Sequence, residues 1–203
     1  MALTTYAELQ ASVADWLARS DLTTQIPDFI ALAEARINRV LRLQAMETAY
    51  TGTIAGGVIA VPSDWLEWRS VWASYSGQVY PLEPASLEVM QRQYPTRSGD
   101  GIPSVIARQA GNFIFGPYPD GNYAIEGVYF ARFALSNAAP TNWLLTYAPD
   151  AYLYGALLAS APYLVDDARV PVWAALHDQA LIELQRQEKR AHLSGGSVAA
   201  RPA

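Results

Sequence analysis

The side chains most suggestive of chemistry are two carboxylates that lie among tryptophans. Asp64 and Glu67 alternate with Trp65 and Trp68, and Trp72 follows four residues later. Carboxylates beside aromatic rings are typical of a glycosidase cleft. Both glycosidase geometries, however, need carboxyls on opposite sides of the substrate, which one short turn does not provide. We therefore interpret this segment as a packed sheet corner, with sugar binding as the alternative.

No other pattern in the sequence predicts catalysis. The chain has no cysteine and two histidines, His177 and His192. A helical metal site would need a second ligand four residues from His177, where Trp173 and Leu181 stand instead. The glycine-rich phosphate-binding patterns and the G-x-S-x-G nucleophile elbow are absent. We expect no enzyme, no cofactor and no metal, with His177 outward or at the edge of the core.

The composition excludes some classes of partner. Of 203 residues, 51% are apolar and only 16% are charged, so the chain can fill a core. The low charge predicts that some weakly polar surface is covered by a partner such as a copy of the chain; the alternative is a monomer with large polar loops. A net charge of −5 argues against a basic face that grips nucleic acid. We find no signal-peptide pattern and no apolar run of transmembrane length.

The helices must be organised around one stretch, residues 151–164, which is apolar on every side. Such a helix is buried, and 14 residues are too few to cross a bilayer. We therefore predict a central core helix, with Pro149 as a turn and Asp150 as its N-cap.

Amphipathic helices are predicted on both sides of this stretch. A capping box at Thr5 and Glu8 opens a helix over residues 5–19, and further helices are predicted over residues 27–44 and 169–190. The polar face of the second helix carries Glu34, Arg36, Arg39 and Arg42. Its arginines are either a solvated face or a contact surface for a neighbouring subunit.

Between these helices, residues 46–135 alternate with the period of strands. Hairpin turns are expected at Gly56-Gly57 and Ser76-Gly77, and a short helix over residues 86–93. The predicted fold is α+β: a four-helix bundle split in sequence between residues 1–45 and 136–190, an inserted antiparallel β meander over residues 46–135, and an extended C-terminal tail over residues 191–203.

Several stretches, in this order and spacing, resemble the head-to-tail adaptor proteins of tailed bacteriophages. They read PDFIALAEARINR (27–39), VPSDWLE (61–67), PTNWLL (140–145), APDAYLYGALL (148–158) and DDAR (166–169), followed by the final helix. The block over residues 148–158 is the most specific of them. None is a catalytic signature.

The resemblance implies a structural virion protein, made in the host cytoplasm, that forms a ring adaptor between portal and tail. The ring is typically twelve-fold, has a tail or nozzle protein below it, and gives a conduit for DNA that is not specifically bound; no membrane is involved. The C-terminal end would dock on the portal, which assigns portal binding to Arg186, Lys189, Arg190, His192, Leu193, Val198 and Arg201.

Two further assignments follow from this resemblance and from the charge. Arg36, Arg39 and Arg42 are the proposed subunit interface, and Glu8, Asp15, Asp21 and Asp28 are candidates to line an acidic lumen in which DNA slides. The alternative function is a carbohydrate-binding tail component or lysin-like module, suggested by the tryptophans near Asp64.

Overall fold

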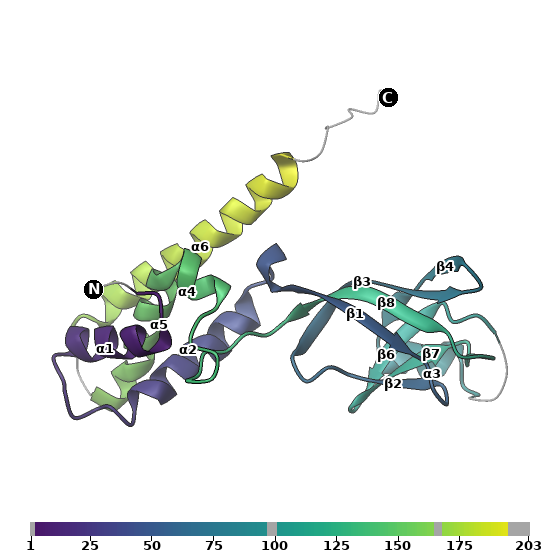
Figure 1. Cartoon of the computed structure of the whole chain (residues 1–203), viewed down its shortest axis with the longest axis horizontal. Coiled ribbons are helices and arrows are strands. Elements are labelled where there is room, and N and C mark those ends of the chain that lie inside the picture. The colour runs from purple at the N-terminus through teal and green to yellow at the C-terminus, as the bar shows by residue number, and fades with distance from the viewer. Residues whose placement is uncertain (1–2, 97–100, 165–167, 195–203) are drawn as a thin grey trace. The chain divides into compact units, whose positions relative to one another are not determined.

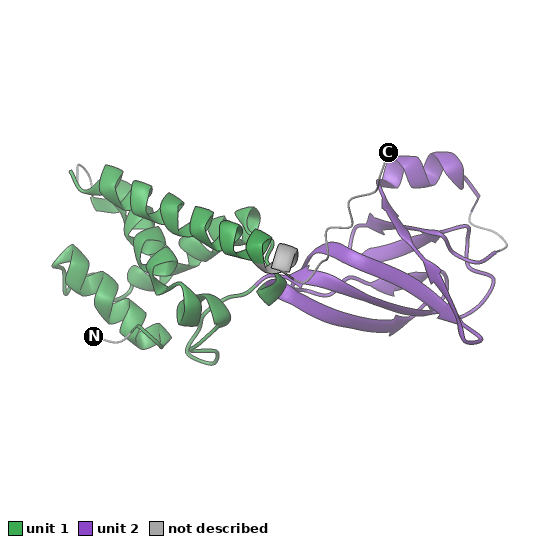
Figure 2. Cartoon of the chain, turned by 90° about the horizontal axis from the view of Figure 1, so that it is seen from above, with its two compact units in different colours: residues 1–45, 133–203 green, residues 46–132 purple. Residues whose placement is uncertain are grey.

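The computed structural model describes residues 3–96, 101–164 and 168–194, with side chains up to residue 190. This part of the chain contains six α-helices and eight strands, so the predicted α+β class is confirmed. The chain divides into a helical unit, residues 1–45 with 133–203, and a β unit, residues 46–132 (Figures 1 and 2).

Helix α5 (Pro149–Leu164) is the centre of the helical unit. It packs against α1 (Tyr6–Leu17), α2 (Ile26–Val40), α4 (Trp143–Tyr147) and α6 (Val170–Ser194). Residues on all sides of α5 are buried, as its uniformly apolar sequence predicts. Gly155 is needed at the closest approach, because a Cβ there would lie 3.1 Å from both the Ala33 methyl and the His177 ring.

The helix ends agree only in part with the predictions. The capping box is present: the Thr5 hydroxyl accepts from the Glu8 N–H, and the Glu8 carboxylate accepts from the Thr5 N–H. Asp150, by contrast, lies inside the first turn of α5, which begins at Pro149. The N-cap prediction for Asp150 is therefore wrong, although a carboxylate in the first turn still suits the helix dipole.

Two other helix ends are shifted along the chain. α2 ends at Val40 rather than residue 44, because Leu41 is extended and the 3₁₀ turn η1 (Gln44–Met46) follows. α6 continues to Ser194, so residues 191–194, predicted as extended tail, are helical. The rest of the predicted tail, residues 195–203, lies outside the described residues.

The β unit contains two four-stranded sheets. The first has the order β1-β8-β3-β4, from β1 (Glu47–Thr53), β8 (Ala124–Ala131), β3 (Trp65–Tyr75) and β4 (Gln78–Pro81), and is antiparallel throughout. The second has the order β2-β7-β6-β5, from β2 (Val58–Ala60), β7 (Asn112–Gly116), β6 (Val105–Gln109) and β5 (Glu83–Ala85).

This topology corrects the predicted antiparallel meander. The first strand, β1, pairs with the last, β8, and β5 runs parallel to β6. The expected hairpin at Ser76-Gly77 joins β3 to β4. The turn at Gly56-Gly57 also forms, but it carries the chain from one sheet to the other. Alternation reveals which residues are strands but not which strands pair, because pairing is decided by long-range packing.

The core of the β unit lies between the two sheets. It contains Ile54, Val71, Ala73 and Ile125 from the first sheet and its edges, and Ile106, Phe113 and Phe115 from the second. The short helix predicted over residues 86–93 is present as α3 (Leu87–Gln93), with Ser86 as its N-cap. It covers another face of the second sheet through Met90. The aromatic residues of the unit therefore serve mainly to join its two sheets.

We expect Gly127→Ala to destabilise the β unit by about 1–3 kcal/mol, because overpacking at a rigid contact costs this much. A Cβ at position 127 of β8 would lie 2.6 Å from the Ser70 carbonyl oxygen and 3.1 Å from the Val71 Cα, both backbone atoms of β3. Urea unfolding followed by tryptophan fluorescence measures the loss. Gly111→Ala is the matched control, since a Cβ there meets nothing within 4 Å. Equal stability of the two variants would contradict the close approach.

Candidate functional site

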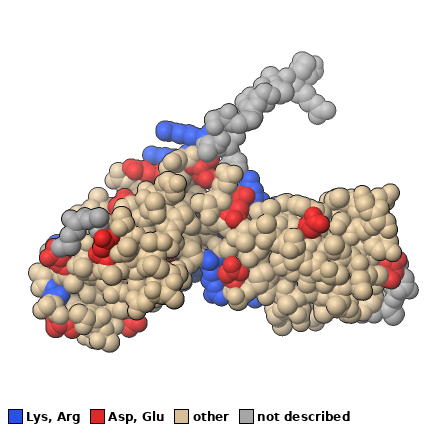
Figure 3. All heavy atoms as spheres, viewed as in Figure 1, with Lys and Arg blue, Asp and Glu red and all other residues tan. Residues whose placement is uncertain are grey.

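Five of the seven residues assigned to portal binding belong to the C-terminal end of α6, which extends past the other helices of its unit (Figure 1). Arg186, Lys189 and Arg190 are exposed within two turns, and Figure 3 shows basic atoms projecting from this part of the surface beside acidic ones. Of the remaining assigned residues, the side chains of His192 and Leu193 are not described, and Val198 and Arg201 lie outside the described residues. The described end of α6 is therefore a cationic projection.

The three arginines assigned to the subunit interface differ in their surroundings. Arg36 and Arg39 are exposed on α2, and an Arg36 guanidinium nitrogen lies 3.8 Å from an Asp178 carboxylate oxygen on α6. Arg42 is half-buried and donates to the backbone carbonyls of Asn38 and Leu41. Arg36 and Arg39 can thus contact another molecule, whereas Arg42 also caps the end of its own helix.

Two of the four carboxylates proposed for the lumen have local partners. Glu8 belongs to the capping box, and hydrogen bonds from Thr4 lower the pKa of its carboxyl. Asp21 accepts two hydrogen bonds from the Arg19 guanidinium, at 2.6 and 2.7 Å, which lower the pKa of its carboxyl to about 2. Asp15 and Asp28 are exposed, on α1 and at the start of α2. Glu8 and Asp21 therefore remain carboxylates at neutral pH.

The tryptophan segment is largely used by the β core. Trp65 and Trp68 pack on Phe113 with ring centroids 5.3 and 5.1 Å apart, and the indole nitrogens of both are buried. The Tyr129 hydroxyl donates to Asp64 at 3.0 Å. A hollow of about 270 Å³ lies beside these rings, with Glu67 in its lining. The arrangement matches the sheet-corner interpretation, because the tryptophan rings pack edge-on against other aromatic rings.

His177 is not at the surface or the core edge but fully buried on α6, so this expectation is wrong. It lies at the same helical face as Trp173 and Leu181, and it packs against Gly155. Its Nδ1 is 3.1 Å from the Ala151 carbonyl oxygen, to which a neutral ring donates. Burial lowers the pKa of His177, so the imidazole is a neutral packing element of the helical unit.

Glu34 is buried, although its sequence pattern predicts a place on the polar face of α2: the residue is only 6% exposed. Its Oε1 accepts from the Leu135 N–H at 2.6 Å and from the Tyr152 hydroxyl at 2.8 Å. The signal was available in its spacing, because Glu34 stands four residues from Ile30 and three from Ile37, both buried.

Around Glu34 a buried polar network joins four segments of the helical unit. The Asn142 side-chain amide donates to the Tyr152 hydroxyl, while its carbonyl oxygen caps α4 by accepting from the Leu145 N–H. On α2, Asn38 exchanges two hydrogen bonds with the backbone of Phe133. Residues 133–135, predicted to belong to the β insertion, are thereby fastened to the helices.

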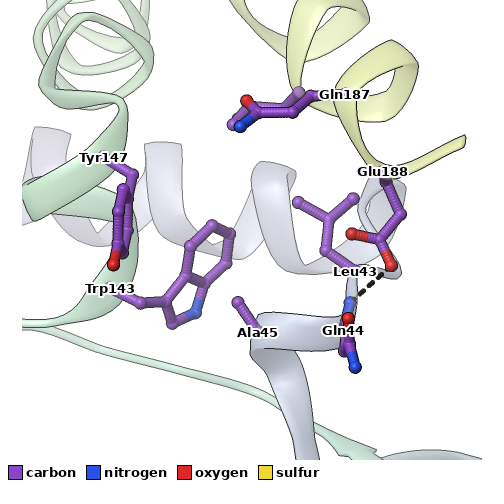
Figure 4. Close-up of a pocket in the computed structure, with 8 residues that line it drawn as sticks. Leu43, Gln44, Ala45, Trp143, Tyr147, Gln187 and Glu188 are labelled. Carbon is purple, nitrogen blue, oxygen red and sulfur yellow. Dashed lines mark hydrogen bonds between the residues drawn. The ribbon is translucent and has the colours of Figure 1, made fainter. Parts of the chain in front are cut away.

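A groove lies beside the end of α6 that carries Arg186, Lys189 and Arg190 (Figure 4). It has a volume of about 410 Å³. Trp143 and Tyr147 of α4 form one side, Gln187 and Glu188 of α6 the other (Figure 4). Leu184 and residues 43–45 complete the lining, and the Glu188 carboxylate accepts from the Gln44 N–H at 2.9 Å. Tyr147 is 79% exposed, so the aromatic side of the groove is open to a ligand.

The buried carboxylate makes the stability of the helical unit dependent on pH. Burial raises the pKa of Glu34 to about 7, in spite of the hydrogen bonds from Tyr152 and Leu135. A raised folded-state pKa contributes stability that is fully present below the unfolded pKa near 4.5 and is lost as the pH rises through about 7. Glu34→Gln keeps an acceptor oxygen and cannot ionise. We expect the variant to exceed the natural chain in stability above pH 7, by roughly up to 3 kcal/mol.

Urea unfolding of both proteins between pH 5 and 8, followed by helical circular dichroism, tests this expectation. His177 acts in the opposite direction, since its lowered pKa costs stability as the pH falls below the unfolded value of 6.5. Both proteins retain His177, so the difference between them isolates Glu34. Glu183→Gln, at an exposed position of α6, is the control for removing a carboxylate. A difference that stays constant with pH would contradict the buried, raised carboxyl.

The described residues contain no group of three or more His, Cys, Asp or Glu side chains placed to hold a metal ion. Among the helices that the structure describes, none is both long and apolar enough to span a membrane.

Comparison with known proteins gives one finding. No curated protein matches the sequence. A family model described as "SU10 adaptor protein" matches residues 4–201, which is nearly the whole chain and includes both units. The match agrees with the resemblance to phage head-to-tail adaptors and indicates a structural rather than a catalytic protein. The chain belongs to the SU10 adaptor protein family.

Proposed function

We propose that this protein is a ring-forming adaptor of the virion, placed between the portal and the tail, through which DNA passes. The observation that carries the proposal is the family match over residues 4–201. The cationic end of α6 supports it, because an exposed basic projection is suited to docking on another protein of the virion.

The helical unit would be the part that closes the ring. We infer that α1, α2, α5 and α6 act as the four-helix bundle, with the short α4 as an accessory helix. A cyclic ring needs two different surfaces on each subunit that meet head to tail. Arg36 and Arg39 on the exposed face of α2 are proposed for one of them, and the sparsely charged surface is compatible with burial against copies.

The DNA conduit would depend on repulsion rather than binding. A net charge of −5 favours a lumen that does not hold phosphates. Asp15 and Asp28 are the better lumen candidates, because they are exposed and no hydrogen bond or ion pair of their side chains is described. The proposal also includes twelve copies in the ring, a tail or nozzle protein below it and synthesis in the host cytoplasm.

The C-terminal end of the chain is the proposed portal anchor. It comprises the described cations Arg186, Lys189 and Arg190, and continues through residues 191–203. We expect Arg186→Glu with Arg190→Glu to weaken binding to purified cognate portal rings tenfold or more, because interface charges that are reversed repel their partners. The loss should shrink as salt is raised from 0.05 to 0.5 M, since exposed charges are screened.

Binding is measured by sedimentation of the portal rings with the added protein. Arg92→Glu on α3 is the control, because it also reverses an exposed arginine but lies in the β unit. If both variants bind like the natural chain, the anchor does not lie on α6. If the natural chain itself does not bind portal rings, the adaptor function is refuted.

The subunit interface is tested by counting copies on the portal. We expect Arg39→Glu to leave incomplete rings, because a reversed charge at each junction is repeated around the ring. Native mass spectrometry of the portal complexes gives the number of copies. Arg39→Lys keeps the charge and should complete the ring. Complete rings formed by the Arg39→Glu variant would show that this face of α2 does not belong to the subunit interface.

A further inference from the structure

We propose that the groove beside α6 is the seat of the chain's own residues 198–203 when the subunit is free. This goes beyond the proposed function, since it concerns a state of the protein before any partner is met. The groove residues are those named above: Trp143 and Tyr147 on α4, Leu184, Gln187 and Glu188 on α6, and residues 43–45.

The groove is suited to a short peptide that contains proline. Trp143 and Tyr147 are separated by one helical turn, so their rings lie on the same side of α4 and face the groove together (Figure 4). Aromatic-lined grooves bind extended proline-containing segments, because the proline ring packs on the aromatic faces and loses little entropy. The amides of Gln44 and Gln187 at the rim can pair with the backbone of such a segment.

The chemistry of residues 198–203 fits this site. They read VAARPA, which has four small apolar residues, one proline and one arginine, and no acidic residue. The charged side chain of the groove lining is the carboxylate of Glu188. The positive charge of Arg201 would therefore lie toward the carboxylate of Glu188 on α6. Pro202 would pack against the aromatic side of the groove on α4, and these two contacts together set the direction of the segment.

The segment is long enough to reach the groove of its own chain. Leu184 and Ser194 are ten residues apart on α6, which is about 15 Å along a helix. The nine residues 195–203 can span about 30 Å when extended, and Gly195-Gly196 permits a reversal at the end of the helix. An intramolecular contact also has a high effective concentration, so a weak site suffices.

A single spin label tests the proposal on the full-length chain. Because the protein has no cysteine, Ala200→Cys gives one site for a nitroxide. Tryptophans are replaced with 5-fluorotryptophan, and Trp143→Phe identifies the fluorine resonance of Trp143. We expect the nitroxide to broaden the Trp143 resonance severalfold more than that of Trp173, which is buried in the N-terminal half of α6.

Tyr147→Ala removes the open aromatic wall and should release the segment, so the extra broadening of Trp143 should fall to the level of Trp173. Tyr163→Ala is the matched control, since Tyr163 is an exposed tyrosine of α5 outside the groove lining. The proposal would be overturned if Tyr147→Ala left the extra broadening of the Trp143 resonance unchanged. It would also be overturned if the natural chain showed no extra broadening of Trp143 relative to Trp173.

A mixture of two differently labelled samples shows whether the bound segment belongs to the same molecule or to a second copy. Labelled protein without fluorine is combined with fluorinated protein without label, so that broadening can arise only between molecules. If the mixture shows the full effect, the occupant is a second copy and the intramolecular seat is refuted. Since all samples contain the free subunit alone, failure here leaves portal binding, which is measured separately, unaffected.

Discussion

The helical unit is organised around a buried hydrogen-bond acceptor, the side-chain Oε1 of Glu34. Glu34 accepts hydrogen bonds from Tyr152 of α5 and from the backbone of Leu135, so α2, the central helix and the segment returning from the β unit share one acceptor. Removing one partner from such a network leaves a buried polar atom unsatisfied, which costs more than the bond itself contributes. The network therefore specifies one arrangement of these segments, beyond what apolar packing of α5 alone would select.

The β unit is built by a different principle. Its two sheets are joined by large aromatic side chains, with Trp65 and Trp68 against Phe113, while Gly127 permits the close approach of β8 to β3 within the first sheet. Because the chain enters through β1 and leaves through the adjacent β8, its two connections to the helices start from neighbouring strands. An insertion with neighbouring ends can be accommodated without disturbing the host unit, which explains how the helical unit can be split in sequence.

These features suit a protein whose work is to make contacts. The exposed end of α6 presents cations and lies beside an aromatic groove. Membership of the SU10 adaptor protein family gives these surfaces a context. Ring closure, portal docking and the self-occupied groove are distinct proposals; residues 198–203 take part in the last two, but each proposal has its own measurement.

Much of the fold followed from the sequence because local signals decide local structure: the capping box at Thr5, the uniformly apolar α5 and the turn at Ser76-Gly77 all lie where expected. The family resemblance also rested on sequence, since it needs order and spacing alone. Tertiary structure decided what depends on residues distant in the chain, namely the pairing of β1 with β8, the burial of Glu34 and His177, and the groove between α4 and α6. A polar residue on a mixed helix face acquires its environment only when a distant partner such as Tyr152 is brought beside it.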